Sequence, residues 1–124
     1  MQTEKPPILA VDDDAGVRNV VHRLAERLGH HCDLAVDGDA ALRLVTAPGA
    51  LRYAVMVLDL HIPGVDAVTL VEAVRAALPG LAVLVVSGYD AEAAAPVLAL
   101  GRARFLQKPF SIADFTSAFG ALIE

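Results

Sequence analysis

The chain has 124 residues, a length that suits one compact domain with a single core and leaves no room for a second domain. Hydrophobic residues make up 56% of it, yet charged residues interrupt every apolar stretch before it reaches bilayer-spanning length, and the N-terminus has no apolar signal segment. The net charge is −5 and the basic residues are scattered. We therefore expect a cytoplasmic protein that has no membrane partner and binds no nucleic acid directly.

Apolar runs of strand length alternate with segments of helical periodicity. The expected strands cover residues 7–12, 31–36, 53–59, 81–87 and 104–107. The expected helices cover residues 15–28, 37–45, 67–77, an alanine-rich stretch after Gly88, and 111–123. Pro96 lies in the alanine-rich stretch and should shorten or kink that helix unless it falls in the first turn. The alternation predicts an α/β domain with a doubly wound parallel sheet and right-handed crossovers.

Polar residues stand where three of the expected strands end. Asp12 and Asp13 follow the first strand, Asp59 ends the third, and Lys108 follows the fifth. Because the carboxyl ends of parallel strands meet in one crevice, these side chains should become neighbours. A carboxylate that ends an almost wholly apolar strand, as Asp59 does, is costly unless a cation or hydrogen bonds stabilise it. Three acids and one cation then suggest a site for a divalent metal and a phosphoryl group.

Four ordered motifs resemble one known family, the receiver domains of two-component response regulators. The motifs cover residues 8–14, 57–66, 85–88 and 105–110, so the likeness spans nearly the whole chain. The resemblance implies a three-layer, flavodoxin-like (βα)5 sandwich with a five-stranded parallel sheet in the order 2-1-3-4-5. It also implies a single receiver domain over residues 1–124, in which 1–6 form a flexible lead-in.

The same resemblance assigns Asp59 as the phosphoacceptor, which takes a phosphoryl group from a sensor histidine kinase or a histidine phosphotransfer protein in a phosphorelay. Asp12 and Asp13 match the acidic pair that, with Asp59 and the backbone carbonyl of His61, binds Mg²⁺ or Mn²⁺. A carboxylate suits this task because it needs no general base to act as a nucleophile. A hard divalent cation held by oxygen ligands would offset the repulsion between Asp59 and the incoming phosphoryl group.

The remaining site residues also come from the resemblance. Lys108 matches the lysine that contacts the phosphoryl oxygens, and its peptide bond to Pro109 is expected to be cis. Ser87 matches the hydroxyl that moves toward the phosphoryl group, and Phe105 matches the aromatic switch, which together change the surface of the fourth helix, fifth strand and fifth helix. His61 and Tyr89 occupy positions that tune dephosphorylation, and we expect their bulk to slow it.

Structural interpretations stay open for several of these residues. Asp12 to Asp14 can be a turn that caps the first helix, and Lys108 can belong to an ordinary proline turn. Ser87 can satisfy a local backbone group, and Phe105 can be plain core. The alanine-rich fourth helix is either part of a homodimer or partner face or an ordinary packed helix.

Two other functions compete with a receiver, which would promote only its own phosphorylation and dephosphorylation. A phosphohydrolase of the haloacid-dehalogenase-like type also forms an aspartyl phosphate, but it needs a second Asp two residues after the nucleophile, where this chain has His61. A nucleotide-binding domain needs a glycine-rich loop after the first strand, where this chain has acidic residues.

Three further expectations concern single residues. Ala67 stands where the family usually has Gly, so a positive φ there would strain the backbone. Cys32, the lone cysteine, should be a buried structural thiol. His22, His30 and His31 resemble surface or strand-edge residues that lack a partner constellation.

Overall fold

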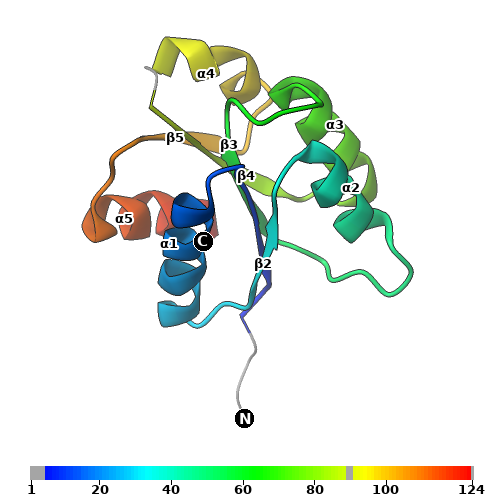
Figure 1. Ribbon diagram of the computed structural model, residues 1–124, viewed down its shortest axis with the longest axis horizontal. Helices are drawn as coiled ribbons and strands as arrows, with labels where there is room; N and C mark the ends of the chain where they lie inside the picture. Colours follow the sequence, from blue (N-terminus) through cyan, green and yellow to red (C-terminus); the bar gives the residue numbers. More distant parts are fainter. Residues whose placement is uncertain (1–4, 89–90, 124) are drawn as a thin grey trace.

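Five parallel strands form one sheet in the order β2-β1-β3-β4-β5 (Figure 1). The structure is a computed structural model, and it describes residues 5–88 and 91–123. The strands are β1 (Ile8–Val11), β2 (Cys32–Ala35), β3 (Val55–Asp59), β4 (Ala82–Ser87) and β5 (Ala103–Gln107). The helices are α1 (Ala15–Arg27), α2 (Gly38–Thr46), α3 (Ala67–Ala77), α4 (Ala91–Leu98) and α5 (Ile112–Ile123). The predicted flavodoxin-like (βα)5 fold and strand order are confirmed.

Helices cover both faces of the sheet (Figure 1). One core lies under α1 and α5, and the other lies under α2, α3 and α4. Alternate strand residues feed the two cores, so that on β1 Ile8 faces α1 and α5 whereas Leu9 faces the other side. Burial of each such side chain contributes roughly 1.5–3 kcal/mol. The three inner strands are therefore held firmly on both faces, and their carboxyl ends have fixed positions.

Aspartates begin three of the helices. The side chains of Asp14, Asp37 and Asp66 accept hydrogen bonds from backbone N–H groups in the first turns of α1, α2 and α3. At α5 the Asp114 N–H donates to Ser111 Oγ at 3.0 Å, which is one half of a capping box. These caps fix where the helices start, just beyond the carboxyl ends of the strands.

The α4 helix is short and contains a proline. It has 8 residues, and Pro96 lies inside it rather than in the first turn. Beyond Pro96, the Ala99 N–H still donates to the Ala95 carbonyl at 2.9 Å. The predicted shortening is thus observed. None of the helices in the described residues is long and apolar enough to cross a bilayer.

The condition for strain at Ala67 is not met, and the expectation for His30 is wrong. Ala67 begins α3, and within 5–88 and 91–123 the non-glycine residue with positive φ is Arg102, so the expected strain at Ala67 is absent. The loop takes its positive φ at Gly64 instead, with φ 90°. His30 is buried, contacts the Pro6 carbonyl through Nδ1 at 2.7 Å, and packs edge-on against Phe119.

Cys32 is buried as expected, and burial raises the pKa of its thiol to about 12. The thiolate is therefore scarce at neutral pH, which suits a structural role. Within the proposed lead-in, Lys5 Nζ donates to the Leu28 carbonyl at 2.7 Å, and the Pro6 carbonyl contacts His30. Residues 1–4 lie outside the described residues.

Arg75 ties α3 to the connection between α4 and β5. Its guanidinium donates to the carbonyls of Leu81, Leu100, Gly101 and Arg102 at 3.1, 3.2, 2.7 and 3.1 Å. Burial and the nearby charge of Arg102 lower the pKa of Arg75. One side chain thereby orients the chain that enters β5, the strand that leads to Lys108.

Candidate functional site

The register of the sheet places Asp12 beside Asp59. Val11 on β1 pairs with Leu58 on β3, and an aspartate directly follows each of them in the chain. Asp59 in turn pairs with Val86 on β4, one residue before Ser87. The predicted meeting of strand ends therefore follows from main-chain pairing, which hydrophobic packing on both faces holds in place.

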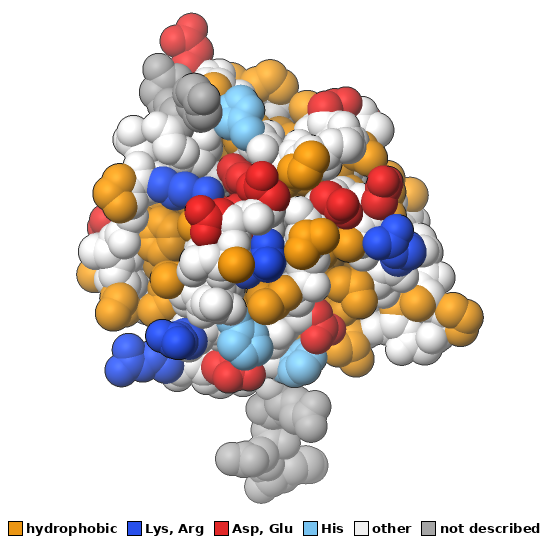
Figure 2. Space-filling view, viewed as in Figure 1, with side chains coloured by type: hydrophobic (Ala, Val, Ile, Leu, Met, Phe, Trp, Pro, Cys, Tyr) orange, Lys and Arg blue, Asp and Glu red, His pale blue; other side chains and the backbone are white. Residues whose placement is uncertain are grey.

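Three carboxylates converge at this edge of the sheet. Oxygen atoms of Asp12, Asp13 and Asp59 lie within 4.8 Å of one another. Asp12 and Asp59 are buried, whereas Asp13 is exposed. In Figure 2, acidic side chains gather on the upper part of the face, with basic side chains among them.

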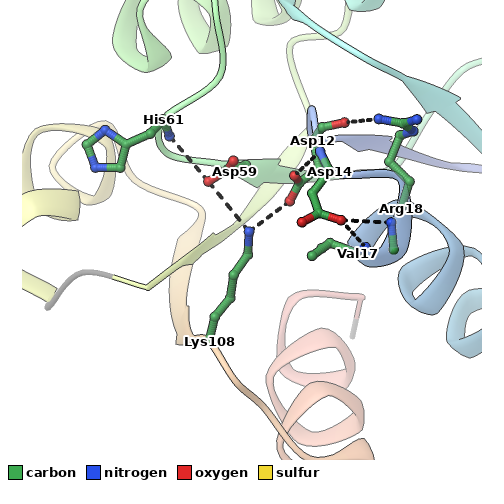
Figure 3. A network of polar contacts seen from close by, with 8 residues as sticks. Asp12, Asp14, Val17, Arg18, Asp59, His61 and Lys108 are labelled. Carbon is green, nitrogen blue, oxygen red and sulfur yellow. Dashed lines mark hydrogen bonds and ion pairs between the residues drawn. The ribbon is translucent and has the colours of Figure 1, made fainter.

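Lys108 reaches this cluster from the end of β5. Its Nζ lies 3.0 Å from Asp12 Oδ2 and 3.8 Å from Asp59 Oδ1, between the two carboxylates (Figure 3). The Lys108 N–H donates to the Ser87 carbonyl at 2.7 Å, which anchors the residue to the end of β4. The Lys108–Pro109 peptide bond is cis, as the family resemblance implies.

Every polar group of Asp12 has a partner. Its N–H donates to the Ala35 carbonyl at 3.1 Å, and its Oδ1 accepts from the Asp14 N–H at 2.9 Å. Its Oδ2 accepts from Lys108, and its carbonyl accepts from Arg18 Nη1 at 2.7 Å (Figure 3). The carboxylate of Asp12 is therefore held in one orientation.

Asp59 is less well compensated. Burial raises the pKa of its carboxyl, and the charges of Asp12 and Asp13 add to the rise. The His61 N–H, which donates to Asp59 Oδ1 at 3.3 Å, and the charge of Lys108 oppose it. The pKa of Asp59 is therefore raised first by burial and second by the charge of Asp12, and the His61 N–H and Lys108 offset only part of the rise.

The donor set at this edge fits a hard divalent cation. All three side chains offer carboxylate oxygen, the ligand type that such ions prefer in proteins. Burial and the charges of Asp12 and Asp13 disfavour the ionised form of Asp59, and a bound cation would favour it. The cluster is thus able to bind a divalent metal ion. The exposed Asp13 leaves it open to solvent.

The other predicted residues lie around this cluster. Ser87 is fully buried at the end of β4. Phe105 is half-buried and packs against the core beneath α3 and α4. The His61 side chain is exposed, and its ring extends to the side of Asp59 rather than over it (Figure 3). Tyr89 lies outside the described residues.

Sequence reasoning missed Arg18. It is half-buried on the first turns of α1, and its guanidinium reaches back to the Asp12 carbonyl. The helical pattern of α1 places Arg18 away from the apolar stripe, which is typical of a solvated side chain. A side chain that binds a backbone carbonyl six residues earlier leaves no local sequence signal.

The comparisons with known proteins agree on one family. A family model described as the response regulator receiver domain matches residues 8–119. The chain belongs to this family. Among curated relatives, the transcriptional regulatory protein FixJ of Bradyrhizobium diazoefficiens is 32% identical over 109 residues, which are 87% of this chain and 52% of FixJ. This receiver domain spans about half the length of the curated relatives that it matches.

Solved structures support the fold. The receiver domain of the hybrid histidine kinase CckA superposes with a TM-score of 0.79 at 28% identity, covering 95% of this chain and 99% of that one. A response regulator from Burkholderia pseudomallei, described with a phosphorylated aspartic acid and a calcium ion, has a TM-score of 0.79 at 24% identity and covers 92% of this chain and 66% of that one. At that identity the second likeness shows the fold alone. The chain is a receiver domain of a two-component response regulator, and the phosphohydrolase alternative is not favoured.

Proposed function

We propose that Asp59 of this receiver domain accepts a phosphoryl group from a phosphohistidine on a sensor histidine kinase or a histidine phosphotransfer protein. One observation carries the assignment: Asp59 is the buried carboxylate at the centre of the cluster, flanked by Asp12, Asp13 and the ammonium of Lys108. The family match supports a phosphoacceptor rather than an enzyme with a free substrate.

The transfer needs little from the protein beyond position and charge. An Asp59 oxygen forms the new bond to phosphorus while the bond from phosphorus to the donor imidazole nitrogen breaks, and the imidazole keeps that electron pair. Lys108 is placed to bind the phosphoryl oxygens, since its Nζ already lies between Asp12 and Asp59. The product is an acyl phosphate, which water can hydrolyse.

Mg²⁺, or Mn²⁺ in its place, is the cofactor that the site best suits. Asp12, Asp13, Asp59 and the backbone carbonyl of His61 would hold it, and the bound ion would neutralise charge on the phosphoryl oxygens. The response regulator from Burkholderia pseudomallei, which combines a phosphorylated aspartic acid with a calcium ion, is consistent with this assignment. Asp12 is already oriented by its partners, and Asp13 lies exposed at the solvent side of the cluster.

Ser87 and Phe105 form the proposed switch. Ser87 is anchored beside Lys108, so a hydroxyl that turns toward a phosphoryl group would pull the end of β4 inward. Phe105 lies on the neighbouring strand, where its half-buried ring can follow into the space that is vacated. The surface formed by α4, β5 and α5 would change in consequence and is the face we assign to a downstream partner or a second copy.

The phosphodonor has a place to dock beside the site. An apolar groove of about 450 Å³ opens between α1 and the loop that connects β5 to α5. Its lining residues are Gly16, Val17, Val20, Lys108, Pro109 and Phe110. Because Lys108 belongs both to this groove and to the cluster, an amphipathic helix seated here would bring its histidine close to Asp59. We expect Val20→Asp to slow transfer from a histidine kinase while labelling by acetyl phosphate stays unchanged.

Labelling with acetyl phosphate tests the whole proposal. With Mg²⁺ present, the protein should gain one phosphoryl group by mass spectrometry, and Asp59→Asn should gain none. Chelation of the metal should stop the labelling. Continuous turnover of a generic phosphomonoester, in place of stoichiometric labelling, would instead support the phosphohydrolase.

The cytoplasmic location stays a prediction.

A further inference from the structure

Arg18 lies at the back of the acidic cluster. It comes from the first turns of α1, and its own N–H donates to the Asp14 carbonyl at 3.0 Å. Its guanidinium turns back toward β1 and donates from Nη1 to the Asp12 carbonyl at 2.7 Å (Figure 3). Helix α1 and the loop that carries the acids are therefore fastened together by one residue.

The loop between β1 and α1 is a closed unit of hydrogen bonds. Asp14 caps α1 by accepting from the N–H groups of Gly16 and Val17 at 2.7 and 3.2 Å. The Asp14 N–H in turn donates to Asp12 Oδ1 at 2.9 Å. Arg18 completes the unit because it holds the carbonyl of Asp12, the residue whose carboxylate the cap orients.

Without Arg18, the Asp12–Asp13 peptide would lose the donor that fixes its orientation. Rotation of that peptide would move Asp13 relative to Asp59, and the cap on the Asp12 carboxylate would move with it. The three carboxylates would then have to be gathered when a cation binds, at a cost in conformational entropy. A partner that orients ligands in advance removes that cost.

We propose that Arg18 is a positioning residue for the divalent cation of the phosphorylation site, acting through the backbone carbonyl of Asp12. This inference rests on the proposed function. Arg18 raises cation affinity even though its own charge is positive, because the pre-arrangement of Asp12 and Asp13 outweighs the repulsion between the guanidinium and the cation.

The two effects have opposite signs, so substitution separates them. Arg18→Met removes both the charge and the hydrogen bond but keeps most of the side-chain length. If positioning dominates, Arg18→Met weakens Mn²⁺ binding by about tenfold. If charge dominates, it strengthens Mn²⁺ binding. Arg18→Lys keeps the charge and one donor, and it should bind Mn²⁺ within about twofold of the wild type.

Direct titration with Mn²⁺, followed by electron paramagnetic resonance of the free ion, measures the affinity without any phosphorylation. Arg27→Met is the matched control, since it removes the same charge from the exposed far end of α1 and should leave the affinity unchanged. Arg18→Gln serves as a second variant if Arg18→Met does not fold, and circular dichroism melts check both.

Labelling by acetyl phosphate gives an independent readout. Arg18→Met should need more Mg²⁺ for half-maximal labelling but should reach the wild-type rate at saturating Mg²⁺, a split that general loss of structure would not produce. Mn²⁺ affinity in Arg18→Met equal to or tighter than in the wild type would overturn the inference. A wild-type protein that binds no Mn²⁺ would instead overturn the proposed function.

Discussion

Lys108 Nζ lies 3.0 Å from Asp12 Oδ2, although 96 residues separate the two in the chain. The same ammonium lies 3.8 Å from Asp59 Oδ1, so it acts as the internal counter-ion of the cluster. A phosphoryl group on Asp59 would offer Lys108 a partner with more negative charge. Until then, the contact with Asp12 keeps the ammonium beside Asp59, where a phosphoryl group would arrive.

Lys108→Met should impair phosphorylation more than metal binding. Loss of the ammonium leaves the carboxylates less neutralised, so Mn²⁺ affinity should stay the same or rise, while the rate of labelling by acetyl phosphate should fall by about tenfold or more. Paramagnetic resonance and mass spectrometry measure the two effects. Arg104→Met, at an exposed cation on β5, is the control. A parallel loss of Mn²⁺ binding in Lys108→Met would contradict this role.

Asp59→Asn should stabilise the metal-free protein at neutral pH. Burial raises the pKa of Asp59 above its ordinary value of 3.8. At a pH between the ordinary pKa of the unfolded chain and the raised pKa of the folded protein, the folded state holds more protons than the unfolded state. The free energy of unfolding therefore falls as the pH rises through this window, and it stays reduced above it. Asn removes the penalty, and the melting temperature at pH 7 in EDTA should rise by roughly 2–5 °C.

The gain from Asp59→Asn should shrink as the pH is lowered toward and below 3.8, where the carboxyl of the wild type is itself neutral. Thermal melts at pH 7 and at acid pH test both limits. Glu72→Gln, at an exposed acid on α3, should show no comparable gain. A constant gain at every pH would mean that the effect does not come from ionisation.

His61 and Tyr89 should slow dephosphorylation, as the bulk of the two side chains suggests. In the described arrangement the His61 ring lies to the side of Asp59, so shielding by His61 requires it to swing over the phosphoryl group (Figure 3). The double variant His61→Ala, Tyr89→Ala should lose its label faster than the wild type in a mass-spectrometric time course. Each single variant then shows which side chain carries the effect. An unchanged lifetime of the acyl phosphate in the double variant would contradict shielding by these side chains.

Arg75→Met should destabilise the fold by about 2–3 kcal/mol, because four backbone carbonyls lose a charged donor. Urea denaturation followed by circular dichroism measures the loss. Arg104→Met should cost no more than about 0.5 kcal/mol. Equal stability of Arg75→Met and the wild type would show that water replaces the guanidinium at these carbonyls.

Exchange of glycine for alanine at position 64 and of alanine for glycine at position 67 should both destabilise the protein, for different reasons. Gly64 has φ 90°, so Gly64→Ala should cost about 1 kcal/mol although a Cβ there would meet open space. Ala67→Gly should also destabilise, by roughly 0.5–1 kcal/mol, because Ala67 is buried in the first turn of α3. If Ala67→Gly were more stable than the wild type, the backbone at Ala67 would be strained after all.

The elements could be predicted because each depends on local pattern. Helix α3 has the predicted bounds, since Asp66 caps it and Pro79 follows its end. The other strands and helices differ from expectation by a few end residues, where backbone pairing rather than hydrophobicity decides. The burial of His30 has no local sequence signal, because it comes from α5 and the segment before β1, which are distant in sequence.

The neighbours Asp12, Asp13, Asp59 and Lys108 could be foreseen because strand ends meet in a parallel sheet. The hydrogen bonds of Arg18 and Arg75 could not, since both join a helical side chain to main-chain carbonyls. A sequence does not distinguish one backbone carbonyl from another as a hydrogen-bond partner. Only the folded chain says which ones lie within reach.

The contributions of the first, third, fourth and fifth strands to one pocket have a consequence for biosynthesis. A nascent chain that has left the ribosome only as far as β4 already has the three carboxylates. It still lacks the ammonium of Lys108, which follows Asp12 by 96 residues. The pocket, with its internal counter-ion, is therefore complete only when nearly all of this domain has been synthesised.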